Sequence, residues 1–549
     1  MRYLVILYIF ILSITSNAQT FRIQSIDSIL NSYGIQGFSP GFTVGIVHED
    51  NLLYHGYRGY MNLEYNLPFN DSTVISLASV TKQFTSACIA ILEKRGKLSI
   101  EDDVRTYIPE LKDYGSIIKI KHLLNHTSGI RNHNVLLNLM GFDYNHEGYT
   151  NKSIQKLMFQ QEGVNNKPGE KMLYSNTNYV LLALIIERVS NESLPEFAKS
   201  NLFEPLQMNS TFYKSNLNAI IKNRSYPYYY HNGSHYQRKS LTHCIGAGGI
   251  KTTIRDMEKW AQVYLDNTHK LHYLGLFTTQ TETLNNNEQM THGKGMFTSN
   301  YNGLKTYNHN GRDIGMRSQF LIIPDLNLAI FVYSNTDEIN AVDLSYSLLN
   351  LWIPEQSKSE VPKNAQTFSS KNLIKFTGDF QELNSDLRMK MFVENDTLKA
   401  LSSFGRNPIP LIRESKTSFS RKNNPSVKYE YILHNQTAEL LNVDFGGAQF
   451  YFEKVTLSGN PNSNVSDFVG SYYSKELNVT YDLKVEDNKL VLNYPNSNNI
   501  ILNEGEQDVF GSNRRTKYEF IRNNKGQVNR FLVSSEGTVK DILFHKILR

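Results

Sequence analysis

The first part of the chain mixes strand-like and helix-like hydrophobic patterns. Residues 41–47 form a nearly continuous apolar run that predicts a buried strand, and residues 52–60 are expected to return beside it. Residues 181–189 have a broad apolar face typical of a helix. Residues 320–323 and 328–333 flank a Pro-Asp-Leu-Asn turn and predict a hairpin. Helices interspersed with such strands predict a sheet with helices packed against it.

The pattern changes after Pro354. Residues 355–370 are polar and predict a linker. Beyond them the helical signal fades, and apolar residues recur every second position, as in antiparallel strands. Residues 429–443 and 483–492 each predict a hairpin around a short polar turn. The C-terminal part is therefore expected to consist of β-structure.

This C-terminal part also contains an internal similarity. Residues 376–380 (FTGDF) resemble residues 468–472 (FVGSY), and the two segments start 92 residues apart. Each unit is long enough for about eight short strands, which predicts two small antiparallel barrels or sandwiches. The alternative is one large sandwich in which the similarity is a coincidence.

The N-terminus has the pattern of a secretory signal peptide. Met1-Arg2 precedes an apolar run from Leu4 to Ile14, and Ser16-Asn17-Ala18 supplies small residues for cleavage after Ala18. The apolar run is too short for a membrane anchor, which needs roughly 20 residues. Gln19 rather than cysteine follows the cut, which argues against a lipid-modified N-terminus. We expect an exported protein, periplasmic or secreted, with no membrane span.

Composition agrees with a globular protein of several domains. The 549 residues are 40% hydrophobic and 20% charged, and they exceed the length of a single core. The net charge of +5 is small, and no Lys/Arg tract suggests a nucleic-acid partner. Cys88 and Cys244 do not make a disulfide framework, and Cys88 lies in an apolar helical pattern. The expected divisions are a signal peptide (1–18), a mixed domain of helices and a sheet (21–354), a linker (355–370) and two β domains (371–457 and 465–549).

Three short motifs in this order carry the candidate chemistry. They are Ser79-Val80-Thr81-Lys82, Tyr174-Ser175-Asn176 and His309-Asn310-Gly311. Each pattern recurs elsewhere in the chain, so a single match has little meaning. Together they supply a nucleophile, a base and a glycine-containing strand edge, which are the parts that acyl transfer to serine requires.

Ser79 has a favourable setting for a nucleophile. A helix is predicted to begin around Ser79 and to end at Lys94-Arg95-Gly96, so Ser79 would lie in a first turn whose N–H groups favour negative charge. Lys82 is one turn further on the same face. An ammonium group cannot accept a proton, so burial must lower the pKa of Lys82 if it acts as a base. The alternative is a helix cap beside a solvated lysine.

The other two motifs have plausible supporting roles. Tyr174 could relay the proton from Ser79, and Asn176 could anchor Lys82 and bind a substrate amide; a buried tyrosine beside a helix cap is the alternative. Gly311 would leave space for a ligand along the strand edge, and the N–H of Arg312 could join that of Ser79 in an oxyanion hole. A simple glycine turn is the alternative there.

With these motifs, the chain resembles the serine β-lactamase and penicillin-binding protein superfamily, on the class C β-lactamase side. The similarity covers roughly residues 25 to 350. Further blocks of the same family are His122-Leu123-Leu124-Asn125-His126-Thr127-Ser128-Gly129, Pro205-Leu206-Gln207-Met208 and Gly246-Ala247-Gly248-Gly249-Ile250. The C-terminal part resembles the lipocalin-like domains attached to some of these hydrolases.

The resemblance implies an α+β fold: a β-lactamase/transpeptidase-like antiparallel sheet flanked by helices, with a helical subdomain and the site between them. It implies Ser79 as nucleophile, activated by Lys82 and Tyr174. From their motifs we place Asn176, His309, Gly311 and Arg312 on the substrate side. His309 replaces the lysine usual in penicillin-recognising enzymes, and a neutral imidazole attracts a carboxylate less strongly. Esters, amides and D-amino-acid peptides therefore stay open as substrates beside β-lactams.

We expect an exported serine hydrolase that acts through an acyl-enzyme and uses no metal or organic cofactor. His122 and His126 have the spacing of two zinc ligands on a helix, but no glutamate stands in the metalloprotease position between them. The expected partner is a small-molecule or peptide substrate, including peptidoglycan fragments. The alternatives are a penicillin-binding or cell-wall-sensing protein with slow or no turnover, and a true class C-like β-lactamase.

Overall fold

The computed structural model describes residues 22–33, 37–49, 51–353, 373–383, 388–402, 407–422, 424–434, 437–445, 449–455, 463–512 and 515–547. The expected signal peptide (1–18) and linker (355–370) lie outside these residues. No helix within the described ranges has both the length and the apolar character needed to cross a bilayer.

A six-stranded antiparallel sheet forms the centre of the N-terminal part. Its strand order is β10-β11-β12-β13-β1-β2. The strands are β10 (Phe297–Tyr301), β11 (Leu304–Asp313), β12 (Met316–Ile323), β13 (Leu328–Ser334), β1 (Phe42–His48) and β2 (Asn51–Arg58). The β1–β2 and β12–β13 pairings match those expected from the hydrophobic pattern.

Helices cover both faces of this sheet. Helix α8 (Ile254–Leu265) packs on β1, β12 and β13, whereas α10 (Ala341–Leu349) contacts β12 and β13. Side chains from the helical residues 22–32 and from α10 share one apolar cluster with β1, β12 and β13. Because β1 is covered on both sides, its residues are nearly all apolar rather than alternating.

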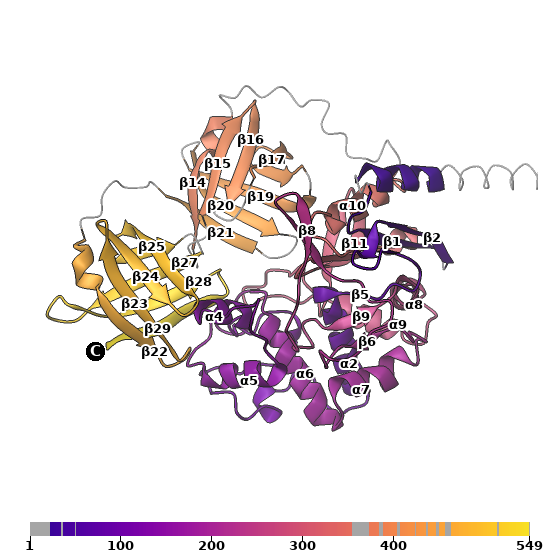
Figure 1. Cartoon of the computed structure of the whole chain (residues 1–549), viewed down its shortest axis with the longest axis horizontal. Helices are drawn as coiled ribbons and strands as arrows, with labels where there is room; N and C mark the ends of the chain where they lie inside the picture. Colours follow the sequence, from indigo (N-terminus) through magenta and orange to yellow (C-terminus); the bar gives the residue numbers. More distant parts are fainter. Residues whose placement is uncertain are drawn as a thin grey trace, which may run out of the picture.

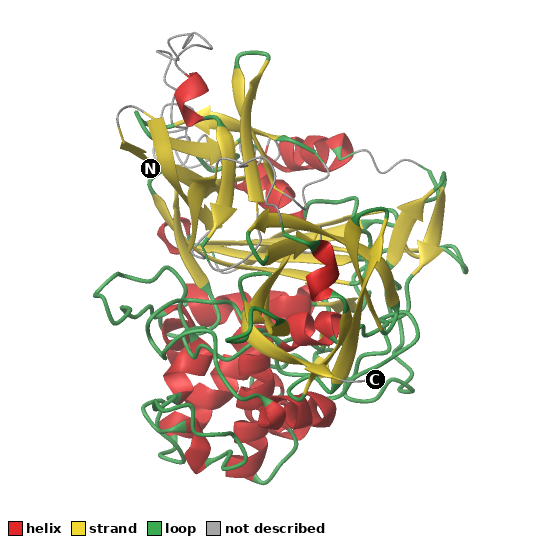
Figure 2. Cartoon of the chain, turned by 90° about the vertical axis from the view of Figure 1, so that its left-hand side faces the viewer, coloured by secondary structure: helices red, strands yellow, loops and turns green. Residues whose placement is uncertain are grey.

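A mainly helical subdomain lies beside the sheet, and Figure 2 shows its helices gathered at one end of the molecule. Its helices are α2 (Lys82–Lys94), α3 (Ile120–Leu124), α4 (His133–Leu139), α5 (Asn151–Gln160), α6 (Asn176–Ser190), α7 (Leu194–Ala198) and α9 (His272–Thr279). Short strands accompany them: β3 (Tyr60–Asn62), β4 (Leu67–Pro68), β5 (Ile75–Ser76), β6 (Phe212–Tyr213), β7 (Tyr228–His231), β8 (Ser234–Gln237) and β9 (Ile250–Thr252). Helices α2 and α6, which are buried along most of their length, pack against each other.

Two closed eight-stranded antiparallel barrels follow, which confirms the predicted duplication of the tail. The first contains β14 (Gly378–Glu382), β15 (Arg388–Glu394), β16 (Thr397–Ser402), β17 (Ile409–Arg413), β18 (Ser418–Arg421), β19 (Asn424–His434), β20 (Thr437–Phe445) and β21 (Gln449–Val455). The second contains β22 (Gly470–Ser474), β23 (Val479–Glu486), β24 (Lys489–Tyr494), β25 (Ser497–Glu506), β26 (Val509–Ser512), β27 (Thr516–Arg522), β28 (Val528–Ser535) and β29 (Val539–Ile547).

Equivalent glycines begin the two barrels in the same conformation. Gly378 has φ +146° and Gly470 has φ +144°, both in the range that disfavours side chains. A Cβ at Gly378 would lie 2.6 Å from Cε of Lys454, and one at Gly470 would lie 2.6 Å from Cε of Lys546. The two FxGxx segments are thus equivalent in structure as well as in sequence.

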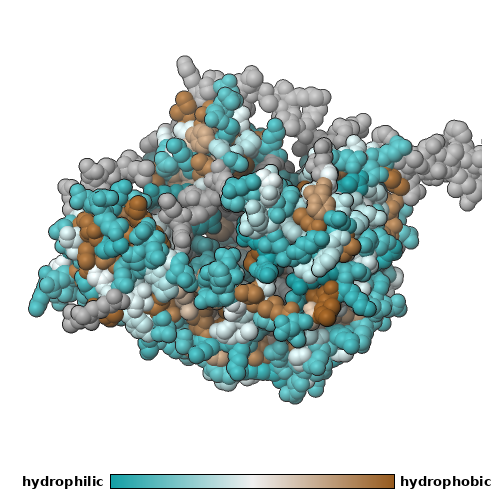
Figure 3. All heavy atoms as spheres, in the orientation of Figure 1, coloured by the Kyte–Doolittle hydropathy of each residue, from teal (hydrophilic) through white to brown (hydrophobic). Residues whose placement is uncertain are grey.

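The two barrels differ in how they pack against the N-terminal part. The first has a separate apolar core, whereas the core of the second is continuous with that of the helical subdomain. Figure 1 shows the second barrel, in yellow, beside α4. In the same orientation the described surface is mainly hydrophilic, with apolar residues in small separate groups (Figure 3).

A buried ion pair fastens the second barrel to the subdomain. Nη1 of Arg131 lies 2.5 Å from Oε2 of Glu476, and these side chains are only 4% and 7% exposed. Arg131 also donates to the carbonyl oxygen of Lys540 at 2.7 Å, and the same Glu476 oxygen accepts from the Glu162 N–H at 2.8 Å. The pair is therefore hydrogen-bonded on both sides, which is the condition under which buried charges are tolerated.

Candidate active site

Ser79 lies on a tight turn between a strand and a helix. Ala78 has φ +48°, an unusual conformation for a residue with a side chain, and a 3₁₀ turn over Ala78–Thr81 leads directly into α2. The sequence predicted a helix beginning around Ser79, whereas its α-helical part begins at Lys82. The turn leaves Ser79 partly exposed at the helix entrance, although the residues on either side are buried.

Lys82 is fully buried and its amine lies beside the hydroxyl of Ser79. The Nζ–Oγ distance is 3.2 Å. Nζ also contacts Oδ1 of Asn176 at 2.8 Å and the carbonyl oxygen of Ala247 at 3.0 Å. No carboxylate pairs with Lys82 within the described part of the chain, and burial lowers its pKa well below 10.5. Burial therefore favours the neutral amine of Lys82 over its ammonium form.

The contacts of the neutral amine determine its orientation. A neutral amine has two N–H donors and one lone pair. The two oxygens of Asn176 and Ala247 can only accept, so they take the two N–H groups. The lone pair then faces the remaining neighbour, the hydroxyl of Ser79, which is the arrangement needed for proton transfer from oxygen to nitrogen.

A chain of amide contacts fixes Asn176 in turn. Nδ2 of Asn176 donates to Oδ1 of Asn134 at 2.8 Å, and Nδ2 of Asn134 donates to the hydroxyl of Tyr149 at 3.2 Å. Because the Asn176 amide nitrogen is occupied by Asn134, its oxygen must face Lys82. Asn134 did not figure in the sequence analysis, since an asparagine outside a motif carries no signal.

Tyr174 completes the group around the nucleophile. Its hydroxyl hydrogen-bonds with Ser79, and the Lys82 amine lies 4.8 Å from the centre of its ring. Burial raises the pKa of Tyr174, so the phenol keeps its proton. Of the two groups beside Ser79, Lys82 is therefore better suited to accept a proton, and Tyr174 is suited to pass one on.

His126 holds Tyr174 in place. Its ring lies 4.3 Å from the Tyr174 ring, its Nδ1 accepts from the Ser175 N–H at 3.2 Å, and its carbonyl oxygen accepts from the Leu173 N–H at 2.9 Å. His126 has φ +62°, and burial lowers its pKa well below 6.5. The other histidine of this block, His122, accepts from the Lys119 N–H through Nδ1.

His309 is buried behind Tyr174. The two ring centres are 6.3 Å apart, only 1% of His309 is exposed, and burial lowers its pKa well below 6.5. His309 does not line the substrate cavity described below. The structure thus brings Ser79, Lys82, Tyr174 and Asn176 together, and it places His309 one layer further from the cavity.

Gly311 packs against the turn that precedes Ser79. A Cβ at position 311 would lie 2.2 Å from Oγ of Ser318 and 2.4 Å from the carbonyl oxygen of Leu77. Glycine is therefore required so that β11 can approach the Ser79 turn, a reason that the sequence analysis did not anticipate. Arg312, next on the strand, lines the cavity together with Ser79.

The site opens into a cavity of about 730 Å³. Ser79, Asn134 and Asn176 line its inner part. Six basic residues also line it, together with three acidic ones: Lys214, Arg224, Arg238, Lys251, Arg312 and Arg317, against Asp313, Asp337 and Glu536. The walls therefore carry an excess of positive charge.

The second barrel reaches this cavity through the loop between β28 and β29. The carbonyl oxygen of Thr538 accepts from the Asn132 N–H at 3.1 Å and from Nδ2 of Asn165 at 2.8 Å. These contacts place Glu536 in the cavity wall, where its carboxyl hydrogen-bonds with the Asn138 side chain and burial raises its pKa. No local pattern in the sequence marks this long-range contribution.

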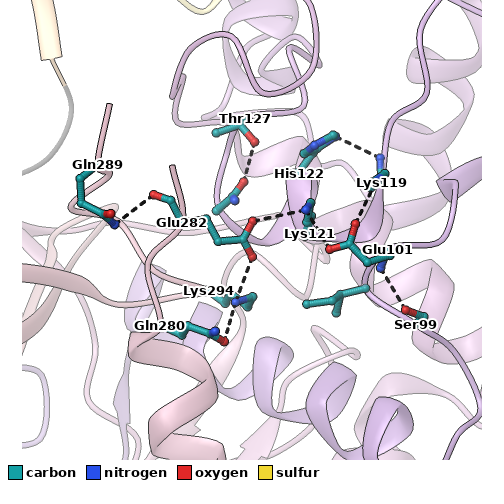
Figure 4. Close-up of polar contacts among 12 residues, drawn as sticks. Ser99, Glu101, Lys119, Lys121, His122, Thr127, Gln280, Glu282, Gln289 and Lys294 are labelled. Carbon is teal, nitrogen blue, oxygen red and sulfur yellow. Dashed lines mark hydrogen bonds and ion pairs between the residues drawn. The ribbon is translucent and has the colours of Figure 1, made fainter. Parts of the chain in front are cut away.

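A second buried lysine, Lys294, has a structural role. Its amine lies 3.1 Å from Oε1 of Glu282 and 2.9 Å from Oε1 of Gln280 (Figure 4). Lys121, at the start of the His122–Gly129 block, lies 3.8 Å from the other Glu282 oxygen and 2.8 Å from Glu101. The Glu282 carboxylate thus balances the positive charge of Lys294, whereas Lys82 has no carboxylate partner in the described part of the chain.

No group of three or more His, Cys, Asp or Glu side chains in the described ranges is arranged to hold a metal ion. A serine at the cavity wall, with a buried amine and a phenol beside its hydroxyl and a sheet flanked by helices around it, is the arrangement of a β-lactamase-type serine site.

The sequence matches the Beta-lactamase family over residues 26–347, and the chain belongs to this family. It is 37% identical over 175 residues to penicillin-binding protein 4* of Bacillus subtilis (strain 168), which covers 31% of this chain and 37% of that protein. It is 27% identical over 333 residues to protein flp of Staphylococcus aureus (strain MRSA252), covering 57% and 62% of the two chains. The chain thus spans less than two thirds of each relative's length.

The fold also matches a solved structure over most of its length. The octameric penicillin-binding protein homologue from Pyrococcus abyssi aligns with a TM-score of 0.54 and 21% identity, over 80% of this chain and 99% of that chain. This likeness establishes the fold, and it confirms the expected β-lactamase/transpeptidase-like architecture.

Proposed function

We propose that the protein is an exported serine hydrolase that cleaves an ester, an amide or a D-amino-acid peptide through an acyl-enzyme on Ser79. The observation that carries the proposal is the fully buried Lys82 amine 3.2 Å from the Ser79 hydroxyl, in a setting that lowers the pKa of the amine. A lysine in this state removes the main obstacle to serine attack, which is the high pKa of the hydroxyl.

In the acylation step, Lys82 takes the proton of the Ser79 hydroxyl while Oγ bonds to the substrate carbonyl carbon. The carbonyl electron pair moves to oxygen, and the N–H groups of Ser79 and Arg312 stabilise the resulting oxyanion. The bond to the leaving group then breaks, and the leaving group takes the proton from Lys82 through the Tyr174 hydroxyl. The amine is neutral again, and the acyl group is bonded to Oγ.

In the second step, water attacks the acyl carbonyl. Lys82, with Tyr174, takes a proton from this water as its oxygen bonds to carbon. The tetrahedral species collapses, the bond to Oγ breaks, and the proton returns to Oγ of Ser79. The products are the free acid and the original enzyme, so the cycle consumes one water and needs no other reactant.

The substrate class is supported by the shape and polarity of the site. The cavity of about 730 Å³ is large enough for a small ester, an amide or a short peptide. Penicillin-binding protein 4* and protein flp are among the relatives of this chain, and the name of the first keeps β-lactams among the candidate substrates. Buried neutral His309 offers no permanent charge for a β-lactam carboxylate, so we place β-lactams below esters and amides.

A substrate panel with purified protein tests the proposal. Short-chain 4-nitrophenyl esters, D-amino-acid amides and a chromogenic cephalosporin are compared for the unmodified protein and Ser79→Ala. We expect sustained turnover of at least one class and a loss of at least about 10³-fold in the variant. A stoichiometric burst without turnover would instead support a binding or sensing protein, and unchanged activity in Ser79→Ala would reject the site.

A further inference from the structure

Three cations occupy one wall of the cavity on the side of β9. Lys251 lies on β9 opposite Ser76, three residues before the nucleophile. The N–H of Lys214 donates to the carbonyl oxygen of Gly249, just before β9. Arg224 forms a β-bridge with Val74, the residue that precedes β5. Backbone contacts thus hold all three residues beside the strand that leads to Ser79.

These three cations lack the carboxylate partners that balance the charge of other cations in the described part of the chain. Within the described ranges, no Asp or Glu lies at ion-pair distance from Lys214, Arg224 or Lys251, although all three line the cavity. Arg317 in the same cavity is paired with Asp337 at 3.6 Å. Positive charge that is partly removed from water and left unpaired is costly, and a bound anion would offset that cost.

The surroundings of Lys251 agree with an unmet need for negative charge. Its pKa is lowered to about 8, mainly by burial and also by Arg224 and Lys214, and only Asp313 acts in the opposite direction. The Asp313 carboxylate already accepts from the Ile314 N–H at 2.8 Å, and it forms no ion pair with Lys251.

The positions of Ser79 and Tyr174 relative to the three cations decide which part of a substrate the cations would contact. The leaving group must lie near Tyr174, because Tyr174 passes the proton to it. Tyr174 does not line the cavity, whereas Ser79 and Arg312 do. The acyl part of the substrate, held at Ser79, is then the part that extends into the cavity toward Lys251.

We propose that Lys214, Arg224 and Lys251 form an anion subsite that binds a carboxylate carried by the acyl part of the substrate. This inference rests on the proposed function, and it deepens that function by naming a substrate class: acyl donors with a free carboxylate several atoms from the scissile carbonyl. Guanidinium and ammonium groups at one point suit a carboxylate because each contributes charge-assisted hydrogen bonds.

Two matched substrates test the proposal. Mono-4-nitrophenyl adipate carries the carboxylate on its acyl chain, and its methyl ester is the neutral counterpart. We expect kcat/KM for the anionic substrate to exceed that for the neutral one by at least about tenfold in the unmodified protein. A ratio near one or below would overturn the subsite while leaving the hydrolase proposal intact.

Variants then locate the preference. Lys251→Met and Arg224→Gln should each reduce the ratio of the two kcat/KM values at least about threefold, and the double variant should bring it close to one. Lys222→Met is the matched control, because Lys222 is exposed and does not line the cavity; it should keep the ratio of the unmodified protein. An unchanged ratio in the double variant would reject the assignment.

Two further measurements separate the remaining outcomes. If 4-acetoxybenzoate, whose carboxylate is on the leaving group, gains as much over phenyl acetate as adipate does over its methyl ester, the placement on the acyl side is wrong. If neither ester is turned over, the proposed function fails first. Calorimetric binding of adipate and of adipamide to Ser79→Ala then decides, because the subsite requires adipate to bind more tightly, and equal binding refutes it.

Discussion

The buried pair between Arg131 and Glu476 should contribute strongly to the attachment of the second barrel. Arg131→Met removes the guanidinium but keeps an apolar side chain of similar length. The Glu476 carboxylate would then keep a single described donor, the Glu162 N–H. The carbonyl oxygen of Lys540 would lose its Arg131 donor. The substitution therefore leaves a nearly buried carboxylate without a countercharge.

The expected cost follows from this geometry. Breaking a buried ion pair by removing one partner typically costs about 3–5 kcal/mol, because the other charge is left desolvated. Removing both charges in Arg131→Met with Glu476→Met should cost less than Arg131→Met alone, so the double-mutant cycle should show coupling of at least about 2 kcal/mol. The exposed pair of Lys119 and Glu101 is the control, and Lys119→Met should cost less than about 1 kcal/mol.

Urea unfolding followed by tryptophan fluorescence measures these values. The chain has two tryptophans, Trp260 and Trp352, and both lie outside the barrels. The second barrel shares a core with the helical subdomain, so the barrel and the subdomain are expected to unfold together. The first barrel has its own core. A loss below about 1 kcal/mol in Arg131→Met, or no coupling in the cycle, would refute the reasoning about this interface.

Three further predictions concern the catalytic groups and the amide that orients them. Since the neutral form of Lys82 is the active one and burial lowers its pKa below 10.5, the acylation rate should fall about tenfold per pH unit below that lowered pKa and level off above it; a stopped-flow acylation rate that rises toward acid pH would contradict this. Lys82→Arg keeps a charge that cannot be removed, so acylation should drop by at least about 10²-fold with the circular dichroism spectrum unchanged. Asn134→Leu frees the Asn176 amide and should lower kcat/KM about 10- to 100-fold; a change of less than about twofold in steady-state kinetics would show that the amide chain does not orient Lys82.

Much of the fold could be predicted from local patterns. The apolar run at β1 and the hairpin of β12 and β13 follow from hydrophobic periodicity and turn chemistry. The two barrels follow from period-two segments and from the repeated FxGxx start, because duplicated glycines with φ near +145° need the same backbone in each copy. These features are local, so a single sequence is enough to find them.

The parts that could not be predicted depend on long-range packing or on backbone atoms. The Ala247 carbonyl oxygen accepts a hydrogen bond from Lys82, and a backbone atom cannot be recognised from the residue type. Asn134 comes into contact with Asn176 only in the folded chain. His309 is at a predicted substrate position in sequence, but the strand turns its ring into the core behind Tyr174. Glu536 comes to the cavity from another domain altogether.

The most direct test of the central claim is the covalent intermediate itself. Rapid-quench mass spectrometry of the digested protein, after mixing with a slowly hydrolysed ester, should find the acyl mass on the peptide that contains Ser79. The same peptide should stay unmodified in Lys82→Arg on this time scale, because the arginine guanidinium stays protonated and cannot accept the serine proton. An acyl group on another residue, or full acylation of Ser79 in Lys82→Arg, would contradict the account.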